Sequence, residues 1–152
     1  MHPKTRTVCL SFGLAIAALV ASSAALATQT PQNLAGVKVV TAAEVQQLQA
    51  KGVPLIDARV AAEYADKTIK GAVSVPYKEK SEKAPDFDRK KDTFDIAKLP
   101  ADKNAPLVFF CNSGECWKSY KASVIARDAG YKQVYWFRGG FPEWSAAGLP
   151  TQ

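Results

Sequence analysis

Two cysteines, Cys111 and Cys116, lie where an apolar run of the sequence gives way to an amphipathic one. The run before Cys111 is Leu107-Val108-Phe109-Phe110, which predicts a buried strand. Apolar side chains recur after Cys116 at helical spacing, at Trp117, Tyr120, Val124 and Ile125. Cys111 is therefore expected in a loop that joins the carboxyl end of a strand to a helix. Ligands bind at such loops, and the helix N-terminus favours an anion there, so we predict that Cys111 is a thiolate nucleophile.

The residues that follow Cys111 supply the rest of the predicted site. Their backbone N–H groups form the expected cradle for the thiolate, at Asn112, Ser113, Gly114, Glu115, Cys116 and Trp117. Gly114 allows a backbone turn that residues with a Cβ resist. Cys116 has two interpretations: it is a small residue that packs in the first helical turn, or a resolving thiol that closes a disulfide with Cys111.

Basic residues near other strand ends are accessory candidates. Arg59 follows the second predicted strand together with Asp57. An ion pair that fixes the loop after this strand is the simpler interpretation, and substrate binding is the alternative. Arg138 follows the last strand and faces either the pocket or its surroundings, while Lys118 lies just beyond the acidic Glu115.

The first 27 residues are typical of a secretory signal peptide. Lys4 and Arg6 precede a mostly apolar stretch, residues 8–20, and Ala25-Leu26-Ala27 fits the cleavage site. A spanning helix needs about 20 apolar residues, so a membrane anchor is the weaker interpretation. We expect a periplasmic or secreted protein that has no membrane contact after cleavage, with residues 28–36 as a flexible leader.

Cleavage limits the chemistry of the remaining chain. It removes Cys9 and the only histidine, His2, so catalysis by Ser–His–Asp or Cys–His and histidine metal sites are excluded. No metal or organic cofactor is implied. The whole chain has 20 Lys and Arg against 14 Asp and Glu, and the loss of Lys4 and Arg6 leaves a net charge of +4. This excess is spread along the chain and indicates no nucleic-acid partner. The sequence does not indicate an oligomeric state.

Strands alternate with helices through residues 37–150, which predicts one α/β domain with a parallel sheet covered on both faces. The expected strands are residues 37–40, 54–59, 107–110 and 134–137, and residues 69–76 are expected to form a turn and a further strand. The expected helices are residues 41–51, opened by a Thr41–Glu44 capping box, then 61–66, 117–129 and 142–147. Residues 78–92 are dense in mixed charge. A solvated loop is their simpler interpretation, and a flap beside the cysteine loop, held by Phe87 and Phe94, is the alternative.

Three stretches in this order resemble the single-domain rhodaneses, a family of sulfurtransferases. The first is Leu55-Ile56-Asp57-Ala58-Arg59 with Glu63-Tyr64 and Ile69-Lys70-Gly71-Ala72-Val73-Ser74-Val75-Pro76. The second is Cys111-Asn112-Ser113-Gly114, and the third is Gly139-Gly140-Phe141-Pro142-Glu143-Trp144. The resemblance implies a five-stranded parallel sheet with flanking helices. It also implies that Cys111 takes the outer sulfur of a small donor such as thiosulfate as a persulfide, and passes it to a thiol or protein acceptor.

Two departures from the family pattern bear on function. Many active-site loops of the family carry a basic residue where this chain has Glu115, which disfavours an anionic donor unless its carboxylate points to solvent. The second cysteine, five residues after Cys111, makes a thiol–disulfide redox protein an alternative in an oxidising compartment. A catalytically silent binding module is a further alternative. A related phosphatase is disfavoured, because Trp117 stands where such a loop needs an arginine.

Overall fold

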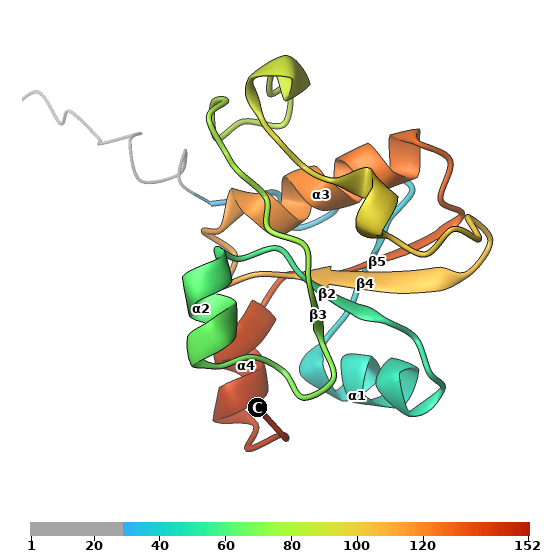
Figure 1. Ribbon diagram of the computed structural model, residues 1–152, viewed down its shortest axis with the longest axis vertical. Coiled ribbons are helices and arrows are strands. Elements are labelled where there is room, and N and C mark those ends of the chain that lie inside the picture. Colours follow the sequence, from blue (N-terminus) through green and yellow to red (C-terminus); the bar gives the residue numbers. More distant parts are fainter. Residues whose placement is uncertain (1–28) are drawn as a thin grey trace, which may run out of the picture.

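The computed structural model of the protein describes residues 29–152 (Figure 1). The predicted signal peptide, with Cys9 and His2, lies outside the described residues. The strands are β1 (Lys38–Val39), β2 (Leu55–Asp57), β3 (Val73–Ser74), β4 (Pro106–Phe110) and β5 (Gln133–Phe137). The helices are α1 (Ala42–Ala50), α2 (Ala61–Asp66), α3 (Trp117–Asp128) and α4 (Gly140–Ala146), with short 3-10 helices at Arg89–Lys91 and Ile96–Lys98.

The five strands form one sheet in the order β1-β5-β4-β2-β3, and every neighbouring pair is parallel. This confirms the predicted α/β class and the five-stranded parallel sheet. β4 is central: Val108 lies opposite Leu55 of β2 on one side and Tyr135 of β5 on the other. Because all strands run in one direction, the carboxyl ends of β2, β4 and β5 meet at the same edge of the sheet.

Helices cover both faces of the sheet, with α3 on one side and α1, α2 and α4 on the other (Figure 1). Alternate residues of β4 point to opposite faces, so Val108 and Phe110 pack in the core beneath α1 and α4. Leu107 and Phe109 pack in the core beneath α3. All four side chains are fully buried, which explains why β4 is read from the sequence as a continuous apolar run.

Local signals determine where the helices begin and end. Thr41 is the N-cap of α1: its hydroxyl accepts from the Glu44 N–H, and the Glu44 carboxylate accepts from the Thr41 N–H at 2.9 Å. This confirms the predicted capping box. Gly52 follows the helix with φ of 79°, a conformation that favours glycine. The last helix, α4, begins at Gly140, two residues before the predicted position.

The mixed-charge loop, residues 78–92, is held to α3 by a buried lysine. Lys121 is 0% exposed, and its Nζ lies 3.4 Å from Glu79 Oε2 and 3.7 Å from Asp92 Oδ2. The same ammonium donates to Ser81 Oγ at 2.8 Å. Phe87 is buried in one cluster with Trp117 and other residues of α3. The structure therefore favours the flap interpretation over a freely solvated loop.

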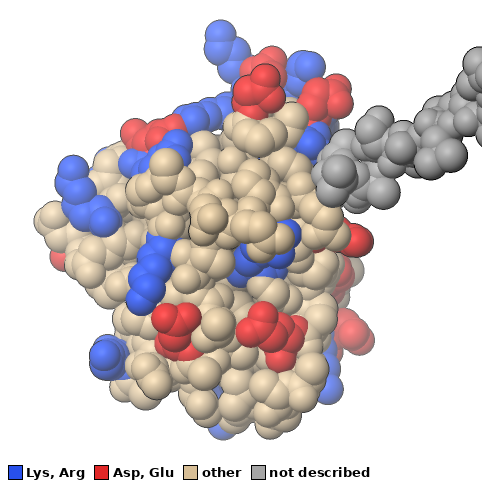
Figure 2. Space-filling model, turned by 180° about the vertical axis from the view of Figure 1, so that it is seen from behind, with Lys and Arg blue, Asp and Glu red and all other residues tan. Residues whose placement is uncertain are grey.

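The outer part of this loop is solvated, and charges of both signs gather over it at the top of the molecule (Figure 2). Asp92 anchors its base by accepting hydrogen bonds from Ser81, Tyr77 and the Lys80 N–H. Burial by itself raises the pKa of Asp92, but these hydrogen bonds outweigh it and hold the pKa at about 2. Asp92 is therefore a charged, structural group at the base of the flap. Separately, no helix within residues 29–152 is long and apolar enough to cross a membrane.

Candidate active site

Cys111 directly follows β4, at the carboxyl edge of the sheet where the sequence predicts the site. Its carbonyl oxygen accepts a hydrogen bond from the Phe141 N–H at 2.8 Å, which ties it to the first turn of α4. Gly140 makes this close approach possible, because it has φ of 61° and any Cβ there would overlap the Cys111 carbonyl group. Gly140 of the third sequence stretch thus helps to position the cysteine.

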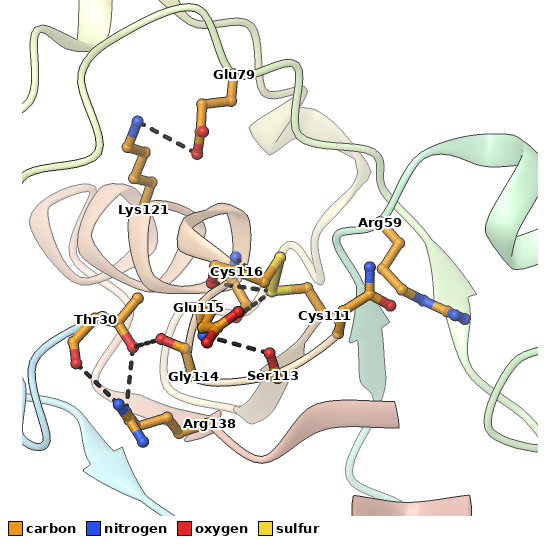
Figure 3. Close-up of a disulfide and its surroundings, with 12 residues drawn as sticks. Thr30, Arg59, Glu79, Cys111, Ser113, Gly114, Glu115, Cys116, Lys121 and Arg138 are labelled. Atoms are coloured by element: carbon orange, nitrogen blue, oxygen red, sulfur yellow. Dashed lines mark hydrogen bonds and ion pairs between the residues drawn. A yellow bond between two sulfur atoms is a disulfide. The ribbon is translucent and has the colours of Figure 1, made fainter. Parts of the chain in front are cut away.

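Cys111 and Cys116 are joined by a disulfide, with their Cα atoms 6.3 Å apart (Figure 3). Cys116 is the N-cap residue of α3. The interpretation of Cys116 as a resolving thiol anticipates this bond, whereas the packing interpretation does not. The two residues differ in exposure: Cys111 is only 1% exposed, and Cys116 is partly exposed.

The buried sulfur of Cys111 has three polar neighbours: the Cys116 carbonyl oxygen at 3.2 Å and two groups of Ser119 of α3, which are its hydrogen-bond donors. Ser119 Oγ lies 2.9 Å from Cys111 Sγ, and the Ser119 N–H donates to the same sulfur at 3.4 Å. Behind it, Trp136 Nε1 donates to Ser119 Oγ at 3.0 Å. An indole N–H can only donate and a disulfide sulfur carries no proton, so the Ser119 hydroxyl donates to sulfur. The same donors stabilise negative charge on this sulfur once the disulfide opens.

Sequence reasoning missed Ser119 and extended the cradle only to Trp117. Two of the predicted amides have other partners: the Glu115 N–H donates to Ser113 Oγ at 3.3 Å, and the Cys116 N–H donates to the Ser113 carbonyl at 3.0 Å. They close the turn of the loop. A usable signal was present, because Ser119 is the third residue of the predicted helix, where backbone N–H groups have no partner within the helix.

Arg59, an accessory candidate, has a structural role. Its guanidinium binds Asp57 through Nε at 3.0 Å and Nη2 at 2.7 Å, and it lies 4.4 Å from the ring centre of Phe141. It is 3% exposed and points away from the disulfide (Figure 3). The ion-pair interpretation therefore holds for Arg59. Glu63 of α2 binds the cysteine loop, accepting from Asn112 Nδ2 at 2.7 Å.

Arg138, the other strand-end candidate, holds the leader against the loop. It donates to Thr30 Oγ1 at 3.1 Å and to the Thr30 carbonyl at 2.9 Å, with further bonds to Gln29 and Pro31. Thr30 is buried and donates from both its N–H and its hydroxyl to the Gly114 carbonyl at 2.7 Å. The sequence analysis anticipated none of these contacts for the leader. The Arg138 guanidinium lies so close to Gly114 that a Cβ there would come within 2.7 Å of it.

A cavity of about 330 Å³ opens beside Cys116. Lys118 of α3 and Lys83 of the flap line it, together with Glu79 and Glu115. Both carboxylates have partners: Glu79 pairs with Lys121, and Glu115 accepts from Gln29 Nε2 at 2.9 Å. Glu115 is exposed, so its charge is also screened by solvent. Of the three basic candidates, only Lys118 lines this cavity.

Comparison with known proteins identifies the family of this domain. Residues 41–147 match the rhodanese-like domain family, and this range includes the cysteine loop and every helix and strand from α1 to α4. The chain belongs to the rhodanese-like domain family. The match confirms the family to which the three sequence stretches point.

Several solved rhodanese-like structures share the fold. A human single-domain sulfurtransferase is 26% identical, with a TM-score of 0.53, over 72% of this chain and 96% of its own. A thiosulfate sulfurtransferase from Pseudomonas aeruginosa is 20% identical, with a TM-score of 0.55, over 76% of this chain and 20% of its own. The rhodanese-like domain of an Anabaena protein is 21% identical, with a TM-score of 0.56, over 78% of this chain and 80% of its own.

One curated relative has a different overall organisation. An HTH-type transcriptional regulator of Mycobacterium tuberculosis is 32% identical over 113 residues, which is 74% of this chain. The rhodanese-like chain spans only 43% of that relative's length. The shared part is therefore the domain, and it says nothing about a regulatory role for this chain.

The site of this rhodanese-like domain combines a disulfide, hydrogen-bond donors at the Cys111 sulfur, and two lysines that line the cavity beside Cys116. Among residues 29–152, no three His, Cys, Asp or Glu side chains gather as a metal site requires. A thiolate at Cys111 needs no general base, because it attacks without giving up a proton.

Proposed function

We propose that the protein is a periplasmic or secreted sulfurtransferase in which Cys111 carries the transferred sulfur as a persulfide. The observation that supports this most strongly is the pair of Ser119 donors at the Cys111 sulfur, at the end of β4. Membership in the rhodanese-like family and the sulfurtransferases among its structural neighbours support the reaction class.

The disulfide must open before Cys111 can act, because Cys111 is 1% exposed while the bond is closed. Reduction by a thiol yields two cysteines, and Cys111 ionises against the Ser119 donors. The Cys111 thiolate then attacks the outer sulfur of a donor such as thiosulfate. A new S–S bond forms on Cys111, the S–S bond of the donor breaks, and its electron pair leaves with sulfite. An acceptor thiolate next attacks the outer persulfide sulfur, and Cys111 leaves as a thiolate.

Intact-mass analysis tests this proposal. The protein is reduced, freed of reductant and incubated with thiosulfate or with a low-molecular-weight persulfide. We expect a mass increase of one sulfur atom that a reductant reverses, and none in Cys111→Ser. Cys116→Ser is the matched control, since it removes a neighbouring thiol but retains Cys111. No added sulfur with any donor would exclude the proposal.

The Cys111–Cys116 disulfide supports a second candidate, a thiol–disulfide redox protein. In that function the disulfide itself is the reacting group: it oxidises a partner thiol pair and is thereby reduced to two thiols. Counting free thiols in protein purified without reductant distinguishes the two. A redox protein recloses the bond quickly under mild oxidant, whereas two persistent free thiols would exclude the redox function.

A further inference from the structure

The two sulfurs of the disulfide face different surroundings. Cys116 lines the cavity described above, and Cys111 does not. With Cys111 1% exposed, an incoming reagent meets Cys116 Sγ first. Attack on a disulfide is directed by which sulfur can be reached and by how well the other sulfur leaves.

The surroundings of Cys111 Sγ, the inner sulfur, favour it as the leaving group. When the S–S bond breaks by attack at Cys116, the electron pair remains on Cys111 Sγ, where the Ser119 hydroxyl and N–H already donate. Trp136 Nε1 holds the Ser119 oxygen in this orientation at 3.0 Å. Donors that are in place before charge develops favour the step that creates the charge.

The cavity around the outer sulfur carries unpaired positive charge. Among residues 29–152, no carboxylate lies within 4 Å of the ammonium groups of Lys83 and Lys118, although seven other ion pairs form. Of the two carboxylates that line the cavity, Glu79 is paired with Lys121. Glu115 keeps its charge, because its partner is the neutral amide of Gln29, but it is exposed and its charge is screened by solvent. Ammonium groups on flexible stems bind oxoanions as point charges.

We infer that Cys116 is the entry sulfur of the oxidised protein, and that Lys83 and Lys118 bind the oxoanion group of an incoming sulfur nucleophile such as sulfite. A sulfite lone pair forms a bond to Cys116 Sγ, the bond from Cys116 to Cys111 breaks, and Cys111 Sγ keeps the electron pair as a thiolate. The disulfide is the oxidant, so no other reagent is needed. Cys116 becomes an S-sulfonate, and the step frees the thiolate that sulfur transfer requires. Only that last consequence rests on the proposed function.

Sulfite cleavage of the oxidised protein tests the direction of attack. Oxidised protein is treated with sodium sulfite, the freed thiolate is capped with iodoacetamide, and the peptides are mapped by mass spectrometry. We expect the sulfonate on Cys116 and the cap on Cys111. The reverse assignment, or an even mixture of both, would overturn the inference.

Rates test the role of the lysines. Lys83→Gln and Lys118→Gln should each slow cleavage by sulfite by roughly three- to tenfold, as expected from the loss of one charge a few ångströms from a dianion. The rate of cleavage by the neutral tris(hydroxymethyl)phosphine should stay within about twofold of the wild-type rate. Lys51→Gln, at the exposed C-cap position of α1, is the matched control and should leave both rates unchanged. Equal slowing with both reagents would show that the lysines act on structure and not on the anion.

These outcomes are separable from the proposed function. A sulfonate on Cys111 would overturn the entry-sulfur assignment, while persulfide formation on reduced protein would still support sulfur transfer. A sulfonate on Cys116 without any persulfide on reduced protein would support the entry-sulfur assignment and exclude sulfur transfer.

Discussion

Ser119→Ala should make Cys111 harder to ionise in the reduced protein. The substitution removes the hydroxyl donor 2.9 Å from Cys111 Sγ and keeps the backbone N–H at 3.4 Å. A hydrogen bond to a charged group contributes about 1.5–3 kcal/mol, so the midpoint of Cys111 ionisation should rise by about one to two pH units. Persulfide formation at neutral pH should slow accordingly, since the thiolate is the nucleophile.

The ultraviolet absorbance of the thiolate, followed against pH, measures this midpoint. The experiment uses reduced protein in a Cys116→Ser background, so that Cys111 is the only thiol in residues 29–152. Stability must be measured alongside, because the variant leaves the buried Trp136 Nε1–H without its acceptor, at a cost of about 1–3 kcal/mol.

Ser123→Ala separates the two effects. Ser123 is 0% exposed on the same helix, and its hydroxyl donates to the Ser119 carbonyl at 2.8 Å without contacting sulfur. Ser123→Ala should lower stability and leave the pH midpoint of Cys111 ionisation unchanged. An unchanged midpoint in Ser119→Ala, or the same rise in Ser123→Ala, would refute the assignment of Ser119 as the donor that stabilises the thiolate.

Three further predictions concern the surroundings of the site. Asp92→Asn should destabilise the protein by about 2 kcal/mol at neutral pH, because the folded state lowers the Asp92 pKa from 3.8 to about 2. This contribution is complete above about pH 4 and lost as the pH falls through 2. Urea midpoints of variant and wild type should therefore converge near pH 2, and a difference between them that does not change with pH would contradict this role of Asp92. Gly114→Ala should displace the Arg138 guanidinium and cost about 1–2 kcal/mol in urea unfolding, and an unchanged midpoint would show that the leader contacts contribute nothing. Cys116→Ser should lengthen the life of a Cys111 persulfide, because Cys116 can no longer close the disulfide and expel sulfide; equal lifetimes by mass spectrometry would exclude a resolving role.

The fold follows largely from local sequence patterns. β4 is an unbroken apolar run because both faces of the central strand are buried, and the Thr41–Glu44 capping box marks the start of α1. The position of Cys111 follows from the same reasoning, since a residue directly after a central parallel strand must lie at the carboxyl edge of the sheet.

The finer parts of the site depend on tertiary contacts that spacing does not reveal. Lys121 looks like a solvent-exposed helix residue in the sequence, yet Glu79 and Asp92, from a segment some 30 to 40 positions earlier, allow its burial. Arg138 points to the leader because Thr30 and Pro31 offer carbonyl oxygens there. The position of Ser119 in the helix indicates a free N–H, but the orientation of its hydroxyl depends on Trp136, on a different element.

Transfer of a labelled sulfur atom through the protein is the most direct test of Cys111 as a sulfur carrier. Reduced protein receives thiosulfate that is labelled only at its outer sulfur, is separated from excess donor, and is then mixed with an acceptor thiol. We predict that the label is first bound to the peptide that contains Cys111 and then appears on the acceptor, and that Cys111→Ser retains none. Label that never becomes bound to the wild-type protein, or that binds equally well without the Cys111 thiol, would contradict the account.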